Sequence, residues 1–195
     1  MHTILKHDFS QELSEITDVL STFSFTSEDI LAGGGGKSGV TKLIEYPLNL
    51  RGWHEKTFDV KTTVDGQVNK AYTHGVDCYK NRVAFEIEWN NKDTFFDRDL
   101  SAFRLLHDIN AISVGIIITR CDGLQDIFDL LGVGASYGTM TTHMNKLMRR
   151  LNGNISGGCP ILVIGIGENQ LDDSTGDWNT RMRAAAGPSI IEDFM

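Results

Sequence analysis

The sequence has few cysteines, no long hydrophobic run and no secretory signal. Its three cysteines (Cys78, Cys121 and Cys159) are odd in number and lack metal-type spacing, which argues against a disulfide framework and a zinc site. We therefore expect reduced thiols in a cytoplasmic protein. The longest apolar runs, 112–118 and 160–167, have the length of buried strands and fall short of the ~18 residues of a membrane span. The N-terminus lacks the basic start and apolar middle of a signal peptide.

Positive charge is also scarce. The formal net charge is -8, which counts against a protein that passively coats nucleic acid but allows an enzyme that gathers acids in one site. The length of 195 residues and the 41% of hydrophobic residues suit a single domain over 1–195. Within it we expect a flexible Gly-rich loop at 33–39 and an only partly ordered C-terminal tail at 168–195.

Apolar periodicity predicts alternating helices and strands. Expected helices lie at 9–23, 40–53, 97–111, 124–131 and 141–152, and expected β segments at 54–68, 76–89, 113–120 and 159–167. The second helix should turn at Pro47 and Gly52, the third should be capped by an aspartate, and the first β segment should end in the turn Asp65-Gly66. This order predicts an α/β fold with a central mixed β-sheet flanked by helices.

The stretch "GGGGKSG" has some likeness to a phosphate-binding P-loop. That motif needs a glycine where Leu31 stands, and it should follow a buried strand. Nucleotide hydrolysis is therefore not favoured. Two alternatives stay open: a mobile surface loop, or a loop that folds over a phosphate backbone through Lys37, Lys42 and its amide groups.

The segment "VDCYKNRVAFEIEW" places acids in a β context. Glu86 and Glu88 share one strand face, roughly 7 Å apart, and Asp77 precedes them before a short turn. Converging carboxylates hold hard cations such as Mg²⁺, and such an ion activates water and polarises a phosphoryl oxygen. The alternative is a solvated strand face whose acids pair with basic side chains, namely Lys61, Lys70 or Arg82.

The pattern Asp77…Glu86-Ile-Glu88 resembles the PD-(D/E)XK nuclease motif, in the variant where an acid or amide replaces the lysine. The stretches "GVTKLIEYPLNLRGWHEK", "KNRVAFEIEWNN", "AISVGIIITR" and "GASYGTM…PILVIGIG" are similar, in order, to the BamHI/BglII/BstYI group of type II restriction endonucleases. The likeness covers about 38–167 and implies a restriction-endonuclease-like fold. No proline precedes Asp77, and the tail has no counterpart in that group.

The resemblance also implies roles for the acids. Asp77, Glu86 and the backbone carbonyl of Ile87 would bind Mg²⁺, with Mn²⁺ able to substitute. Glu88 stands at the lysine position and would position or deprotonate the attacking water. Glu55, in "GWHEK", would be a further catalytic acid, although a surface glutamate at a strand start remains the alternative.

Two segments are candidates for DNA contact. Amide and basic side chains read base edges in the major groove, and the turn after the acidic strand offers Asn90, Asn91, Lys92 and Asp93. A solvated turn is the alternative. The second segment, "GASYGT", contributes Ser136, Tyr137 and Thr139 ahead of a helix whose N-terminus could hold phosphate.

The function implied by the resemblance is a Mg²⁺-dependent homodimer that cuts double-stranded DNA at a short palindrome, centred on GATC, and leaves 5′ four-base overhangs. A cognate DNA methyltransferase is expected in the same system, without physical association. Apolar residues of the helices at 101–109 and 140–151 could form the dimer interface, or could pack on the sheet instead. A repair-type nuclease or nickase on the same fold and a non-catalytic metal-binding protein remain alternatives.

Overall fold

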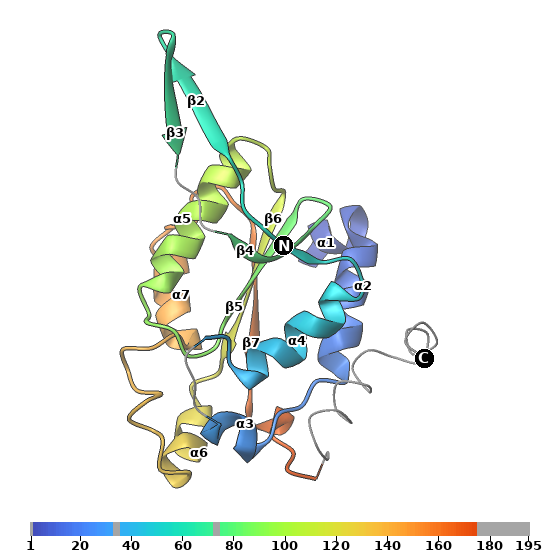
Figure 1. Cartoon of the computed structure of the whole chain (residues 1–195), viewed down its shortest axis with the longest axis vertical. Helices are drawn as coiled ribbons and strands as arrows, with labels where there is room; N and C mark the ends of the chain where they lie inside the picture. The colour runs from blue at the N-terminus through green and yellow to red at the C-terminus, as the bar shows by residue number, and fades with distance from the viewer. Residues whose placement is uncertain (1, 33–35, 72–74, 175–195) are drawn as a thin grey trace.

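A five-stranded mixed sheet forms the centre of the molecule (Figure 1). The computed structural model describes residues 2–32, 36–71 and 75–174. The strand order is β1-β4-β5-β6-β7, with antiparallel pairing from β1 to β5 and parallel pairing from β5 to β7. The strands are β1 (His54–Lys56), β4 (Val76–Lys80), β5 (Val83–Glu88), β6 (Val114–Arg120) and β7 (Ile161–Ile166). The predicted α/β fold with a central mixed sheet is confirmed.

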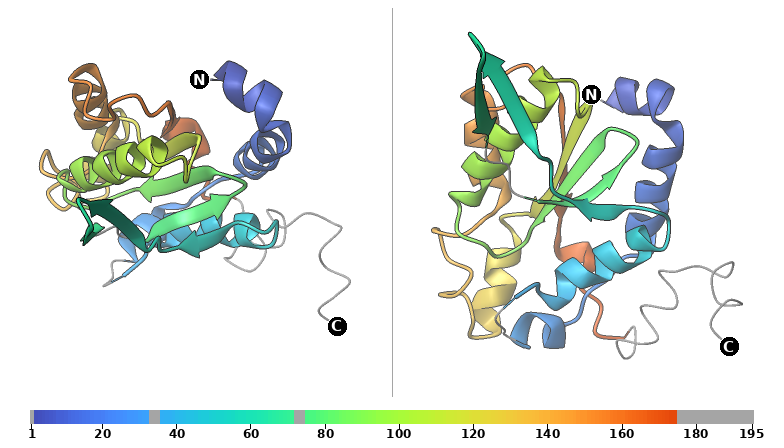
Figure 2. Two further views of the ribbon diagram at one scale, coloured as in Figure 1. Left: turned by 90° about the horizontal axis from the view of Figure 1, so that it is seen from above. Right: turned by 45° about the horizontal axis from the view of Figure 1, so that its top comes forward.

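Helices cover both faces of this sheet (Figure 2). One hydrophobic cluster joins α5 and α7 to Ala84 and Ile117, and the other joins α2 and α4 to Phe85 and Ile116. The helices are α1 (His2–Asp8), α2 (Ser10–Ser21), α3 (Ser27–Leu31), α4 (Gly39–Asn49), α5 (Phe95–Asp108), α6 (Leu124–Leu130) and α7 (Met144–Asn152), followed by a short 3-10 turn, η1 (Glu168–Gln170). No helix in the described part of the chain is long and apolar enough to cross a bilayer.

The strand β6 is buried along its whole length, as expected for a parallel strand covered on both faces. Gly115 allows α5 to pack closely on it. A Cβ atom at Gly115 would lie 2.5 Å from the ring of Phe103 and 2.7 Å from Ile161. The site-bearing strand β5 lies between β4 and β6, so its position is fixed by the core.

The predicted β segment 54–68 is divided between two sheets. Its first part is β1, whereas β2 (Val60–Val64) pairs only with β3 (Gln67–Ala71) in a separate hairpin that projects from the body (Figure 1). The predicted turn joins β2 to β3, with positive φ at Asp65 and Gly66. All three residues of β1 are exposed, so the alternating pattern there did not reflect a buried face.

Several helix boundaries also differ from the expected ones. Helix α4 continues through Pro47 to Asn49, and the chain turns at Gly52 with φ of 86°. Helix α5 begins at Phe95 without a side-chain cap. The expected capping residue, Asp97, instead accepts two hydrogen bonds from Arg150 of α7, at 2.7 and 2.9 Å.

The apolar stripe proposed for a dimer interface mainly packs inside the chain. Phe103, Leu106 and Leu147 are fully buried and belong to the cluster beneath the sheet. Ile109, Met140 and Met148 of these two segments are exposed, at 41%, 71% and 39%. The sheet-packing alternative therefore holds for those three buried residues.

The expected loop and tail are only partly within the described residues. Residues 33–35 of the Gly-rich loop and 175–195 of the tail lie outside them. The described start of the tail is structured: it contains η1, and Leu171 forms a parallel bridge with Phe25.

Candidate active site

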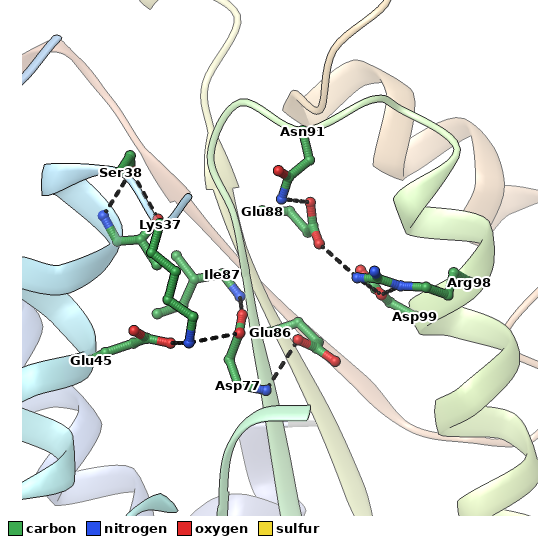
Figure 3. A network of polar contacts seen from close by, with 11 residues as sticks. Lys37, Ser38, Glu45, Asp77, Glu86, Ile87, Glu88, Asn91, Arg98 and Asp99 are labelled. Atoms are coloured by element: carbon green, nitrogen blue, oxygen red, sulfur yellow. Dashed lines mark hydrogen bonds and ion pairs between the residues drawn. The ribbon is translucent and has the colours of Figure 1, made fainter. Parts of the chain in front are cut away.

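The three residues expected to hold a metal meet where the pairing of β4 with β5 ends. The paired register stops at Cys78 and Phe85. Beyond it, the Asp77 N–H donates to Glu86 Oε2 at 3.2 Å, and the Ile87 N–H donates to Asp77 Oδ2 at 3.0 Å (Figure 3). Both carboxylates thus accept backbone donors at the opening of the hairpin.

The acids of β5 do not lie on a solvated face. Glu86 is 1% exposed and Glu88 is 2% exposed. Lys61, one of the basic partners considered for a solvated face, pairs with Asp59 instead. Burying two carboxylates side by side is costly unless they are compensated, so these positions indicate a functional site and not a surface strand.

Glu88 lies in a pocket that favours its neutral form. Its Oε2 accepts a hydrogen bond from Asn91 Nδ2 at 2.7 Å, and Arg98 Nη2 lies 3.4 Å from its Oε1. Thr119 fixes the backbone by donating to the Glu88 carbonyl at 2.8 Å. Burial, followed by the negative charge of Asp99, raises the pKa of Glu88 to about 9. Burial thus favours the protonated form of Glu88 in the metal-free protein.

A fourth acid, Glu45, enters the site from α4. Its side chain is buried, and the Lys37 ammonium forms an ion pair with it and lies 3.3 Å from Asp77 Oδ1 (Figure 3). Burial raises the pKa of Glu45, although the hydrogen bond from Lys37 opposes this. Ser38 caps α4 by accepting the Thr41 N–H at 3.1 Å, which sets Lys37 immediately before the first turn.

Glu45 was not predicted as a site residue, although the sequence contains a signal for it. The buried positions Val40, Ile44 and Leu48 recur at helical spacing, and Glu45 lies next to this stripe. A glutamate beside the apolar face of a helix that precedes the acidic strand is a candidate site residue, because charged residues are seldom buried without a partner.

Glu55 lies at the edge of the site. It is exposed on β1, and its side chain covers Gly75: a Cβ atom there would lie 3.2 Å from Glu55 Oε1. Gly75 is two residues before Asp77, so Glu55 lies against the segment that leads into Asp77.

A cleft of about 960 Å³ opens over these acids. It brings together ten of the residues predicted for the site, namely Lys37, Lys42, Asp77, Glu86, Ile87, Glu88, Asn90, Asn91, Ser136 and Tyr137. The other predicted residues, Glu55, Lys92, Asp93 and Thr139, do not line it. The cleft therefore joins Asp77, Glu86 and Glu88 to two residues of each segment proposed for DNA contact.

The first segment proposed for DNA contact is bonded to the residues that directly follow the second. The Thr142 N–H donates to the Asn91 carbonyl at 2.8 Å, and the Asn91 N–H donates to Thr142 Oγ1 at 3.2 Å. The Asp93 N–H donates to the Met140 carbonyl at 3.0 Å. This pairing explains why α7 starts at Met144, three residues later than expected. The Asp93 carboxylate forms ion pairs with α7, including one to Lys146 at 3.1 Å.

Tyr137 supports the second segment from inside. Its ring is buried and stacks on Phe128 with centroids 4.1 Å apart. Arg120, buried at the end of β6, donates to the Tyr137 carbonyl and to Thr141 Oγ1. Tyr137 thus lines the cleft with a ring that is mostly buried, whereas Ser136 is exposed.

The N-terminus of α7 is not an open phosphate site. The Asn145 N–H donates to Asp122 Oδ2 at 3.0 Å, and the His143 ring contacts the same carboxylate. An acidic side chain thus already occupies this helix end, which counts against the expected phosphate site there.

The donor chemistry of the site suits a hard divalent cation. Asp77, Glu86 and the Ile87 carbonyl offer oxygen atoms only, which are the ligands that Mg²⁺ prefers, and a cationic group, the Lys37 ammonium, already lies against Asp77. Within residues 2–32, 36–71 and 75–174, no three Asp, Glu, His or Cys side chains lie close enough to share one metal ion. The proposed set needs only two of these side chains, Asp77 and Glu86, together with the Ile87 carbonyl.

The comparisons with known proteins agree with this geometry. The family described as restriction endonuclease BglII/BglIII matches residues 2–166. No curated protein matches the chain. The match includes every strand of the central sheet, all four acids and both segments proposed for DNA contact. The chain therefore belongs to the BglII/BglIII restriction endonuclease family and is a site-specific deoxyribonuclease.

Proposed function

We propose that this enzyme makes Mg²⁺-dependent double-strand breaks at a short palindrome centred on GATC, leaving 5′ four-base overhangs. The observation that carries the metal-dependent part is the contact between Asp77 and Glu86 in a cleft, within a chain that matches a restriction endonuclease family over 2–166. The GATC centre and the overhang follow from the sequence resemblance.

Asp77, Glu86 and the carbonyl of Ile87 are the proposed metal ligands. A bound Mg²⁺, or Mn²⁺ in its place, polarises a phosphoryl oxygen and lowers the pKa of water. The protein would fix where the metal ion binds. The Ile87 N–H donates to Asp77 Oδ2 at 3.0 Å, so the Asp77 carboxylate and the Ile87 backbone stay together at the end of the hairpin.

Glu88 is the proposed partner of the attacking water. Burial favours its protonated form in the metal-free protein, and a cation nearby favours its ionised form. The ionised carboxylate can then orient the water and accept its proton. Asn91 and Arg98 hold the two oxygens of Glu88, which restricts its orientation. Glu55 is proposed as a further acid at the edge of the site.

DNA would lie in the cleft, with its phosphate backbone near Lys37 and Lys42. Asn90, Asn91 and Lys92 are the proposed base readers, and Ser136 and Thr139 are exposed on the neighbouring segment. Because Asn91 bonds to Glu88, we infer that the reading of a base and the placement of the catalytic acid depend on each other.

One chain carries one set of these acids. A palindromic site has the same base sequence on both strands. A two-fold homodimer would therefore place one site on each strand. A cognate DNA methyltransferase would protect the same sequence without binding to this protein.

Plasmid digestion tests this proposal directly. The purified protein is incubated with plasmid DNA and Mg²⁺, and the fragment ends are sequenced. Discrete fragments that share a GATC-centred palindrome and a 5′ overhang are expected. Nicked circles alone would indicate a repair-type nickase, and intact DNA with no binding would indicate a protein without nuclease function; both outcomes contradict the proposal.

A further inference from the structure

Lys37 places a positive charge directly on the proposed metal ligands. It precedes Ser38, the N-cap of α4, and its side chain extends into the acidic site (Figure 3). The ammonium forms an ion pair with Glu45 and lies 3.3 Å from Asp77 Oδ1. The side chain remains 42% exposed, whereas Glu45 and Asp77 are 10% and 22% exposed. The Lys37 side chain is thus more accessible to solvent than the two acids that it pairs with.

The Lys37 ammonium lies against Asp77 Oδ1, an oxygen atom that the proposed metal ion would bind. Asp77 has two carboxylate oxygens: Oδ2 accepts the Ile87 N–H and Oδ1 faces Lys37. In the part of the chain that the structure describes, Lys37 is the one basic side chain that forms an ion pair with Asp77 or Glu45. A divalent cation cannot bind Asp77 Oδ1 while the ammonium stays there, because the two positive charges repel each other across a partly desolvated gap.

Little holds Lys37 in place apart from these acids. The preceding residue, Gly36, has φ of 118°, and no atom lies within 4 Å of where its Cβ would be. The Lys37 side chain is itself 42% exposed, so part of it borders solvent into which it can turn. Glu45 offers a second anchor, so the ammonium can leave Asp77 and keep one ion pair.

We propose that Lys37 is a built-in competitor of the divalent cation. In the metal-free enzyme the Lys37 ammonium pairs with Asp77 and Glu45. When a divalent cation binds, Asp77 exchanges the ammonium for the cation. Lys37 then keeps its ion pair with Glu45 or turns to a DNA phosphate. This inference rests on the proposed metal site and adds that the affinity of the site is lowered by a residue of the same chain.

Mn²⁺ binding to the full chain, without DNA, measures this competition. Titration followed by electron paramagnetic resonance reports free and bound Mn²⁺ without any turnover. Lys37→Met removes the charge and keeps the length of the side chain, and Lys37→Gln serves as a second variant. Both should bind Mn²⁺ about fivefold more tightly than the parent, the factor expected for the loss of one partly exposed ion pair.

Lys42→Met is the matched control, because Lys42 lies nearby on α4 and lines the same cleft without an ion pair to Asp77 or Glu45. Its Mn²⁺ affinity should equal that of the parent. Equal or weaker binding by both Lys37 variants would overturn the competition, and so would tightening by Lys42→Met to the same extent. Asp77→Asn separates a failure of the proposed metal site from a failure of the proposed competition by Lys37. If this variant binds Mn²⁺ as tightly as the parent, the metal site itself is wrong.

Discussion

Replacing Glu88 with glutamine should stabilise the metal-free protein, and should do so more strongly as the pH rises. Glu88 is almost fully buried, and burial together with the charge of Asp99 raises its pKa from an ordinary value of 4.5 to about 9. The unfolded chain loses this proton near the ordinary value, whereas the folded chain keeps it until about 9. Between these values the folded state binds one more proton, so the free energy of unfolding falls as the pH rises.

The size of the effect follows from linkage. One proton corresponds to about 1.4 kcal/mol per pH unit, so the parent should lose up to about 2.7 kcal/mol relative to Glu88→Gln between roughly pH 6 and pH 8. Glutamine keeps an oxygen that can accept the Asn91 hydrogen bond and has nearly the same volume. Titrating groups away from this site are common to both proteins, so they cancel in the difference.

Urea unfolding in EDTA at several pH values measures this difference. The free energies of unfolding of the parent and of Glu88→Gln should diverge steadily with pH, the variant being the more stable. A difference that stays constant between roughly pH 6 and pH 8 would show that Glu88 is already ionised in the folded protein. The reasoning from burial would then be refuted.

Two further predictions concern base reading and assembly. Asn91→Ala should lose roughly 1 to 3 kcal/mol of discrimination between cognate and random DNA, measured by competition gel shift. It should also slow cleavage of bound DNA, because Glu88 loses its hydrogen bond of 2.7 Å; an equal loss of affinity for both DNAs would contradict a reading role. The purified protein should sediment as a dimer at micromolar concentration, and a monomer both free and on cognate DNA would count against cutting of both strands by one assembly.

Periodicity was sufficient to predict the architecture. The fully buried strand β6 and the strand β7 were readable because their apolar runs are short and end in turn residues, although β7 is a partly buried edge strand and not the core strand expected. The Asp65-Gly66 turn was readable because its conformation requires positive φ, which these residue types tolerate. Boundaries were less predictable. Helix α7 begins late because Thr142 pairs with the Asn91 turn, a contact between segments about 50 positions apart in the chain.

The site was predictable only in part. Asp77, Glu86 and Glu88 could be named because they lie on one local hairpin, where spacing alone brings them together. Lys37 was considered for phosphate contact, and its ion pairs with the acids were not anticipated. Glu45 was missed, because its contact with Asp77 through Lys37 depends on how α4 packs on the sheet. Tertiary packing, which no local pattern encodes, completes the site.

The most direct test of the central claim is a paired measurement on Glu86→Ala. Glu86 is 1% exposed and faces Asp77, so in EDTA the acids should repel the phosphate backbone that they must cut. The variant should show no cleavage in a Mg²⁺ digestion time course, yet it should bind the cognate duplex in EDTA at least as tightly as the parent in a gel shift. Cleavage by Glu86→Ala at the parental rate would contradict the metal site at Asp77 and Glu86.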